Sequence, residues 1–193
     1  MAAHQKKARR LNAWLVFLDE SGLLLLPVVR RTWGRRGCTP VLWHRGRHRQ
    51  KVSAIAALCV SPDRRRVRLY FQLLIDANFT AAAVLAFLHQ LARHLQAPFA
   101  LVWDRSTTHR GLAIATFLDV VGAVQFAFPA YAPELNPVEY VWSYLKTKPL
   151  ANLACPDVDV LATVGRRHGR SLQRRPHLLR AFLRHSPLPL RLE

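Results

Sequence analysis

Three apolar runs of strand length precede any segment with a helical pattern. They cover residues 13–18, 52–60 and 67–75, and the third alternates enough to pair with a neighbouring strand. The sequence DESG at residues 19–22 predicts a turn after the first run. Residues 61–63 (SPD) form a second turn, with proline at its favoured position. This order predicts a three-stranded antiparallel meander.

Strands and helices alternate in the rest of the chain. Thr80 can cap a first helix, Gly122 is a stop signal for a second, and Asn136 can cap a third. The predicted helices cover residues 81–95, 111–121 and 136–146, and the strands between them cover residues 99–103 and 124–128. A meander followed by this alternation predicts an α/β fold, a mixed five-stranded sheet with helices on both faces.

One domain accounts for most of the 193 residues, since no internal repeat or long linker divides them. We expect a basic N-terminal arm at residues 1–12, the folded domain at residues 13–150, and a basic helical C-terminal tail at residues 151–193. The longest apolar runs are far shorter than the roughly 20 residues of a membrane span. The basic N-terminus is not followed by a signal-type segment. These features predict a soluble protein with no membrane partner.

The cysteines exclude two common site types. Cys38, Cys59 and Cys155 are odd in number, lie far apart and form no CxxC pair. Neither a disulfide framework nor a zinc ribbon is therefore indicated, and a reducing cytoplasm suits the chain.

The charge balance indicates a polyanionic partner. The chain has 29 Lys+Arg against 11 Asp+Glu, a net charge of +18. Nucleic acid is the expected partner, because each neutralised phosphate releases counterions and so favours binding. The alternative is that the arginines partly reflect codon usage. Residues 166–184 of the tail form one basic face, and a second basic stretch lies near the N-terminus.

That second stretch, residues 30–51, mixes cations with Trp33 and Trp43. The mixture suits tracking of a DNA backbone, with stacking from either tryptophan, although a solvated hairpin with core tryptophans is the alternative. His44 and His48 have an H-x3-H spacing, but arginines lie among them and no second ligand pair follows. A phosphate-contacting loop is therefore favoured over zinc. The cations are Arg30, Arg31, Arg35, Arg36, Arg45, Arg47, Arg49 and Lys51.

Two aspartates follow apolar strands directly. Asp19 comes after the run WLVFL, and Asp104 comes after FALVW. Neighbouring strand ends bring such side chains together at one edge of a sheet, where ligands commonly bind. Two carboxylates repel each other there unless a cation lies between them, which suggests a metal. The alternative is that each is a turn or cap residue.

Glu139 is a third candidate, with an equally simple local explanation. If Asn136 is the N-cap and Pro137 the first helical residue, Glu139 falls at the third position of a capping box. From the residue types alone, capping is the favoured reading of Glu139.

Three segments resemble the signatures of DDE transposases of the mariner-like superfamily, especially its bacterial insertion-sequence branch. They are LDESG at residues 18–22, VWDRSTTH at residues 102–109 and YAPELNPVEYVWSYLK at residues 131–146. The last, with its Tyr-x-Pro-x-Leu-Asn-Pro-x-Glu-x-x-Trp pattern, is the most specific. The 34 residues between Asp104 and Glu139 are a spacing that this superfamily uses.

The resemblance implies a ribonuclease H-like fold and a catalytic metal site. Asp19, Asp104 and Glu139 match the three acidic residues that hold two Mg²⁺ or Mn²⁺ ions in the family. Such a pair of ions clamps the attacking and leaving oxygens of a phosphoryl displacement. The implied activity is strand cleavage and strand transfer at the ends of an insertion sequence, on double-stranded DNA.

Further residues lie near the candidate carboxylates. His109 matches the histidine of the family's D-x4-H pattern and can orient a water or phosphate, or be a surface residue at a helix start. Lys146 lies two turns after Glu139 on the same helix face, where it can contact a phosphate or stabilise the helix C-terminus. Trp142 and Tyr140 are expected to pack rather than to stack on bases.

The chain departs from the family in two ways. Arg105 stands where the family often has asparagine, so it can contact a scissile phosphate but also places a cation beside the metals. Family members usually carry an N-terminal helix-turn-helix region, and only 18 residues precede Asp19 here. We expect that DNA-reading region to be encoded separately or missing.

The resemblance also implies a homodimer on DNA and a cytoplasmic, nucleoid-associated location in a bacterium. An alternative function is a transposase remnant or accessory protein that binds DNA without turnover. A related nuclease, such as a ribonuclease H or junction resolvase, is a third reading, against which the Leu-Asn-Pro-x-Glu segment argues.

Overall fold

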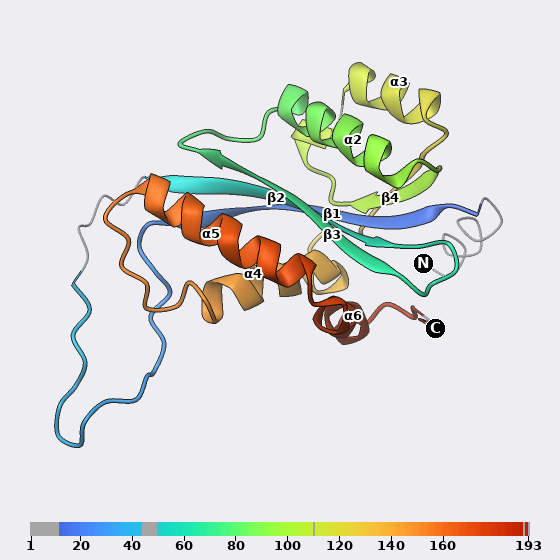
Figure 1. Ribbon diagram of the computed structural model, residues 1–193. Coiled ribbons are helices and arrows are strands. Elements are labelled where there is room, and N and C mark those ends of the chain that lie inside the picture. Colours follow the sequence, from blue (N-terminus) through green and yellow to red (C-terminus); the bar gives the residue numbers. More distant parts are fainter. Residues whose placement is uncertain (1–11, 44–49, 110, 191, 193) are drawn as a thin grey trace.

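A five-stranded sheet forms the centre of the computed structural model, which describes residues 12–43, 50–109, 111–190 and 192 (Figure 1). The strand order is β3-β2-β1-β4-β5. The strands are β1 (Trp14–Leu24), β2 (Lys51–Val60), β3 (Val67–Ile75), β4 (Phe99–Trp103) and β5 (Val124–Ala127). Strands β1 to β3 form the predicted antiparallel meander, and β4 and β5 add in parallel to β1. The predicted mixed α/β sheet is therefore confirmed.

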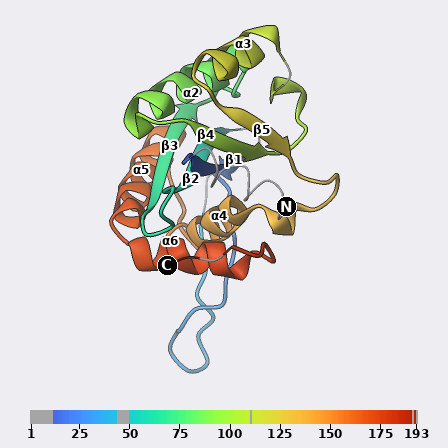
Figure 2. The ribbon, with the colours of Figure 1, turned by 90° about the vertical axis from the view of Figure 1, so that its right-hand side faces the viewer.

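Helices cover both faces of the sheet, as predicted (Figure 2). Helices α2 (Ala81–Leu95) and α3 (Leu112–Val120) pack on one face, and α4 (Pro137–Thr147), α5 (Val158–Gln173) and α6 (Pro176–His185) pack on the other. Two short 3-10 helices, η1 (Thr107–His109) and η2 (Pro133–Leu135), lie in the loops after β4 and β5. Alternate residues of the central strands supply the two apolar cores.

Local signals set the helix ends. The Thr80 hydroxyl accepts a hydrogen bond from the backbone N–H of Ala83 at 3.3 Å and caps α2. The Asp157 carboxylate caps α5 in the same way, through the N–H of Val160 at 2.8 Å. Gly122 follows α3 with a φ of 65°, a left-handed conformation that favours glycine. These ends follow from side-chain capping and backbone freedom alone.

The turn predicted at residues 19–22 is wrong. Strand β1 continues through it to Leu24, and β2 pairs with it throughout, with Asp19 opposite Ala56 and Gly22 opposite Ser53. The turn signals were local, whereas the long partner strand satisfies the backbone hydrogen bonds of the whole segment. Asp19 therefore lies inside a strand rather than after one.

The C-terminal helices are part of the core. Leu161 of α5 and Leu179 of α6 are buried in the same apolar cluster as Leu15 of β1. Helix α5 crosses β3 closely because Gly169 faces the ring of Phe71, and a Cβ at Gly169 would overlap that ring. A glycine here lets the helix approach the sheet.

The close contact between Gly169 and Phe71 should make the stability of the domain sensitive to a larger residue at position 169. Gly169→Ala should lower the free energy of unfolding by about 1–3 kcal/mol through overpacking, although alanine normally favours a helix over glycine by about 1 kcal/mol. Gly165→Ala is the matched control on the same helix, because its Cβ would meet only side-chain methyl groups, Leu23 Cδ1 at 3.2 Å and Leu73 Cδ1 at 3.5 Å. Urea unfolding of both variants tests this. Equal stability of the two would contradict a close approach at Gly169.

Two further features bear on the sequence expectations. In the described part of the chain, no helix is both long and apolar enough to cross a membrane. The three cysteines are free, with Cys38 exposed and Cys59 and Cys155 buried.

Candidate active site

The register of the sheet brings Asp19 and Asp104 together. Strand β4 pairs with β1 only as far as Phe17 opposite Val102. Two residues further along each strand direction lie Asp19 and Asp104, on the same face as Phe17 and Val102 because side chains alternate. Asp104 follows the end of β4 as predicted, whereas Asp19 reaches this place from within β1.

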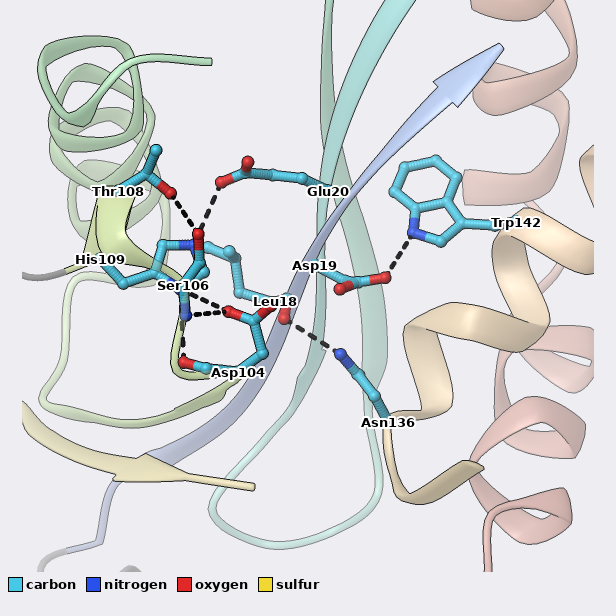
Figure 3. Close-up of polar contacts among 9 residues, drawn as sticks. All are labelled: Leu18, Asp19, Glu20, Asp104, Ser106, Thr108, His109, Asn136 and Trp142. Carbon is cyan, nitrogen blue, oxygen red and sulfur yellow. Dashed lines mark hydrogen bonds and ion pairs between the residues drawn. The ribbon is translucent and has the colours of Figure 1, made fainter. Parts of the chain in front are cut away.

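Helix α4 begins against this edge because Asn136 attaches it to β1. The Asn136 side chain caps α4 through the N–H of Val138 at 3.2 Å and also donates from Nδ2 to the carbonyl of Leu18 at 3.2 Å (Figure 3). Asn136 is buried, so both hydrogen bonds are shielded from water. Glu139, in the first turn of α4, is thereby held beside Asp19.

A pocket of about 300 Å³ lies where these elements meet. Asp19, Asp104 and Glu139 all line it. Much of the remaining wall comes from the loop after β5, residues 128–133. The structure therefore gathers the three predicted carboxylates around one space, although they come from a strand, a loop and a helix far apart in the sequence.

The capping explanation for Glu139 does not hold. In a capping box the Glu139 carboxylate would accept from the backbone N–H of Asn136. That N–H instead donates to the carbonyl of Pro133, at 2.8 Å, and among the described residues none donates to the Glu139 carboxylate. The side chain is exposed at the pocket, where it is available to a ligand.

The charges of the three carboxylates interact with one another. The pKa of Asp19 is raised to about 7, chiefly by burial and also by the charges of Glu139 and Asp104, while a hydrogen bond from Trp142 opposes the shift. The indole Nε1 donates to Asp19 Oδ2 at 2.9 Å. A group that is costly to ionise beside two like charges is a group that a cation would stabilise.

The chemistry of this pocket fits a hard divalent cation. Its donors are carboxylate oxygens, which Mg²⁺ and Mn²⁺ prefer. As the side chains stand, no three acidic, histidine or cysteine residues of the described chain converge closely enough to hold one ion. The side chain of Asp104 is 58% exposed and lines the pocket, so a metal there can reach its carboxylate. Asp19, Asp104 and Glu139 are the residues that would hold it.

His109 is buried behind the pocket rather than on the surface, so it is not the exposed cap residue that one alternative described. It is 8% exposed and stacks on Trp103, with ring centroids 4.2 Å apart and planes 3° apart. Its Nε2 lies 3.1 Å from Glu20 Oε1 and its Nδ1 lies 2.8 Å from Asp104 Oδ1 (Figure 3). Burial lowers its pKa, but the two carboxylates outweigh this and raise the pKa above its usual value.

Lys146 and Trp142 continue the contact of α4 with β1. Lys146 donates from Nζ to the hydroxyl of Ser21 at 2.8 Å and lies away from the residues that line the carboxylate pocket. Trp142 is 2% exposed and packs in the core, as predicted, but it also donates to Asp19. Tyr140 packs against His185, with rings 5.9 Å apart, and donates to its carbonyl.

The other predicted cations are spread over three places. Arg105 is exposed and lines the carboxylate pocket itself. Arg30, Arg31, Arg35 and Arg36 are exposed on a loop that projects from the body after β1, drawn in blue in Figure 1, and Lys51 begins β2. Arg45, Arg47 and Arg49, together with His44 and His48, lie outside the described residues.

The two tryptophans of the projecting loop are exposed to solvent rather than packed in a core. Trp33 is 100% exposed and Trp43 is 86% exposed, so the alternative of a hairpin with core tryptophans is wrong. Asn152 holds the base of the loop, since its side chain exchanges hydrogen bonds with the N–H and carbonyl of Arg30 at 2.8 and 2.9 Å. The segment has no regular structure of its own between Leu24 and Lys51 in the described residues.

Two site contacts escaped sequence reasoning. Glu20, beside Asp19, was not a candidate site residue, and its partner His109 lies 89 positions away. The second contact of Asn136, to Leu18 across 118 positions, was hidden behind its capping role. The only available signal was that Glu20 lies in LDESG and Asn136 in the Leu-Asn-Pro segment.

The chain is similar to known proteins in sequence and in fold. The chain matches the family model of the DDE superfamily endonucleases over residues 14–162. No curated protein matches it significantly.

Solved structures with the same fold include those of the Mos1 mariner transposase. A paired-end complex with Mg is 18% identical, with a TM-score of 0.66, and covers 95% of this chain and 57% of that one. The strand transfer complex is 16% identical, with a TM-score of 0.59, and covers 98% and 60%. The isolated catalytic domain is 14% identical, with a TM-score of 0.54, and covers 98% and 91%. The predicted ribonuclease H-like fold is thus confirmed, and this chain spans about 60% of the Mos1 chains in the two complexes.

Proposed function

The chain belongs to the DDE superfamily endonucleases, and we propose that it is a transposase catalytic domain that cleaves and joins DNA strands at Asp19, Asp104 and Glu139. The observation that carries this proposal is the single pocket that the three carboxylates line. The Mos1 complexes with transposon ends and with Mg or Mn add support from the fold, because they are DNA and metal complexes of that protein. We extend these properties to this chain as part of the proposal.

The three carboxylates would hold two Mg²⁺ or Mn²⁺ ions. When bound, such a pair of ions activates the attacking oxygen and neutralises charge on the leaving oxygen of a phosphoryl displacement. Asp19 and Asp104 approach from the sheet and Glu139 approaches from α4, so the donors surround the pocket on two sides. Trp142 keeps Asp19 oriented by its hydrogen bond. Water attack would cleave the strand at an insertion-sequence end, and 3′-hydroxyl attack would join it to target DNA.

A charge-neutralisation experiment tests the metal site. Nicking of supercoiled DNA by this chain should require Mg²⁺ or Mn²⁺, and Asp104→Ala and Glu139→Ala should each reduce the rate by about a hundredfold or more, because each removes a metal ligand. Asp119→Asn on α3 is the control, since Asp119 is an exposed acid that does not line the pocket. Nicking by both alanine variants at the wild-type rate would refute the proposed activity.

DNA binding follows from the basic surface. Arg35 and Arg36 are exposed on the projecting loop, where no acidic residue intervenes in the sequence between Glu20 and Lys51. We propose that the arginines of this loop, with Arg105 at the pocket and Lys146 on α4, contact backbone phosphates of double-stranded DNA. Such contacts carry affinity and orientation rather than sequence readout.

The salt dependence of binding checks the loop. Arg35→Ala and Arg36→Ala should each weaken binding to duplex DNA and reduce the slope of log affinity against log salt by about 1, the value for one lost phosphate contact. Arg93→Ala on α2 is the matched control, because Arg93 is exposed on the opposite layer of the domain. Fluorescence anisotropy at several salt concentrations measures the slope. An equal slope for all three variants would exclude the loop from the interface.

A DNA-binding remnant without turnover is the second candidate function. Arg105 favours it, because this exposed cation lines the same pocket as the three carboxylates and would compete with a metal ion there. Salt-sensitive DNA binding without nicking, in both Mg²⁺ and Mn²⁺, would establish the remnant. Recovery of nicking in Arg105→Asn would then identify the arginine as the cause.

The assembly around this domain is also proposed. A helix-turn-helix region would read the element ends, and a homodimer would hold two of them. We propose a bacterial insertion sequence as the element, with the protein acting at the nucleoid in the cytoplasm, and residues 13–150 as the catalytic part of a fold whose core α5 and α6 complete. Sedimentation of the chain with and without end DNA would measure the oligomeric state.

A further inference from the structure

Glu20 lies next to Asp19 but faces the other way. Side chains alternate along β1, so Asp19 faces α4 and Glu20 faces the side of α2 and α3. The Glu20 Oε1 atom lies 3.1 Å from His109 Nε2, and Glu20 does not line the carboxylate pocket. Glu20 therefore does not reach that pocket as a metal ligand, and its side chain contacts His109 instead.

His109 is held rigidly between two carboxylates. Its ring stacks on Trp103 at 4.2 Å, and its opposite nitrogens face Glu20 Oε1 and Asp104 Oδ1 (Figure 3). The ring has only 8% exposure, so water has little access to compete for these contacts. The stack fixes the plane of the ring, and Glu20 fixes its rotation within that plane.

The fixed His109 ring restricts the orientation of the Asp104 carboxylate. Its Oδ1 atom accepts from the backbone N–H of Ser106 at 2.9 Å and lies 2.8 Å from His109 Nδ1. Among the described residues, no hydrogen-bond donor is assigned to Oδ2. A carboxylate that is 58% exposed would otherwise sample several rotamers. Here one oxygen is anchored and the other is left for a ligand.

We propose that Glu20 is a positioning residue, which orients the Asp104 carboxylate for metal binding through His109. Hydrogen-bonded supports of this kind hold metal ligands in place, and their loss typically weakens metal binding about 10–100-fold. The inference rests on the proposed metal site and adds two residues to it. It gives a role to His109 and Glu20, which lie behind the carboxylate pocket and do not line it.

The test measures Mn²⁺ binding by the full chain, with free Mn²⁺ followed by electron paramagnetic resonance. Glu20→Leu, which removes the anchor, should weaken Mn²⁺ binding about tenfold or more, and Glu20→Gln, which keeps a hydrogen-bond acceptor, should recover part of that loss. Asp119→Asn removes one exposed negative charge elsewhere and should bind as the wild type does. Thermal unfolding of each variant verifies that the domain is folded.

A double-mutant cycle tests whether the effect passes through His109. Once His109→Asn has removed the ring, Glu20→Leu should cause little further loss of Mn²⁺ affinity, whereas independent effects would add. Additive losses, or a folded Glu20→Leu variant with wild-type affinity, would overturn the inference. A wild-type chain whose Mn²⁺ binding is absent or unchanged by Asp104→Ala would instead refute the metal site itself, so the two failures are distinguishable.

Discussion

Asp19→Asn should stabilise the metal-free domain at pH 8 and at the same time abolish its DNA nicking. Burial and the charges of Glu139 and Asp104 raise the pKa of Asp19 from 3.8 to about 7. Ionised Asp19 is therefore a cost to the folded state, and the amide removes that cost while it keeps an oxygen for the Trp142 N–H. We expect a gain of about 2 kcal/mol, because each pKa unit is worth about 1.4 kcal/mol and water in the open pocket screens part of the repulsion.

The pH dependence has a definite sign. Below pH 3.8 the carboxyl is protonated in both states, so the substitution changes little. As pH rises toward 7 the unfolded state loses the proton first, so the wild type loses stability across this window, and the cost stays constant above pH 7. The advantage of Asp19→Asn should therefore grow from about pH 4 to pH 7 and then level off. Chemical unfolding with EDTA at pH 5 and pH 8 measures it.

Activity should move in the opposite direction. An amide oxygen is a poorer ligand for a hard cation than a carboxylate, so nicking should fall by about a thousandfold or more, near 4 kcal/mol in the barrier. Asp119→Asn should change neither stability nor nicking. A less stable Asp19→Asn domain at pH 8 would show that the carboxylates do not repel one another as placed. An active one would remove Asp19 from the metal site.

Asn136→Ala should lower the free energy of unfolding by about 2–3 kcal/mol. The substitution removes the cap of α4, worth about 1 kcal/mol. It also leaves the buried carbonyl of Leu18 without its donor, which costs a further 1–2 kcal/mol or so. Because this contact holds the start of α4 against β1, Glu139 should lose its position, and nicking should fall even in molecules that remain folded.

Two comparisons separate these contributions. Thr80→Ala removes only a cap, that of α2, and should cost about 1 kcal/mol without loss of nicking. Asn136→Ser keeps a capping oxygen but removes the amide donor to Leu18, so it should lie between the wild type and Asn136→Ala in stability. Guanidinium unfolding measures all three. If Asn136→Ala costs no more than Thr80→Ala, the attachment of α4 to β1 contributes nothing to the fold.

Much of the fold could be predicted because its signals are local. The strands at residues 52–60, 67–75 and 99–103 are continuous apolar runs, and the helix starts at Thr80 and Asn136 carry capping side chains. Asp104 was identifiable in the same way, since it follows a buried strand directly. Glu139 was different: the N–H that a capping box needs donates to Pro133 instead, and only the resemblance to a family grouped Glu139 with Asp19 and Asp104.

The projecting loop and β1 show where local signals fail. The DESG sequence resembles a turn, yet the partner strand β2 continues past it and pairs with every residue as far as Leu24. Trp33 and Trp43 have the composition of core residues, yet they are exposed because the loop between β1 and β2 carries them away from both apolar clusters. Neither outcome depends on a neighbour close in sequence.

By itself, the sequence determined most strands and helices and the family, and it singled out three acidic residues, because apolar periodicity, capping and motif spacing are properties of short segments. Only the tertiary structure decided how those residues are supported. Asp19 meets Trp142 across 123 positions, and Glu20 meets His109 across 89. Such contacts depend on which face of a strand each side chain takes, and that choice follows from the register of β1 between β2 and β4.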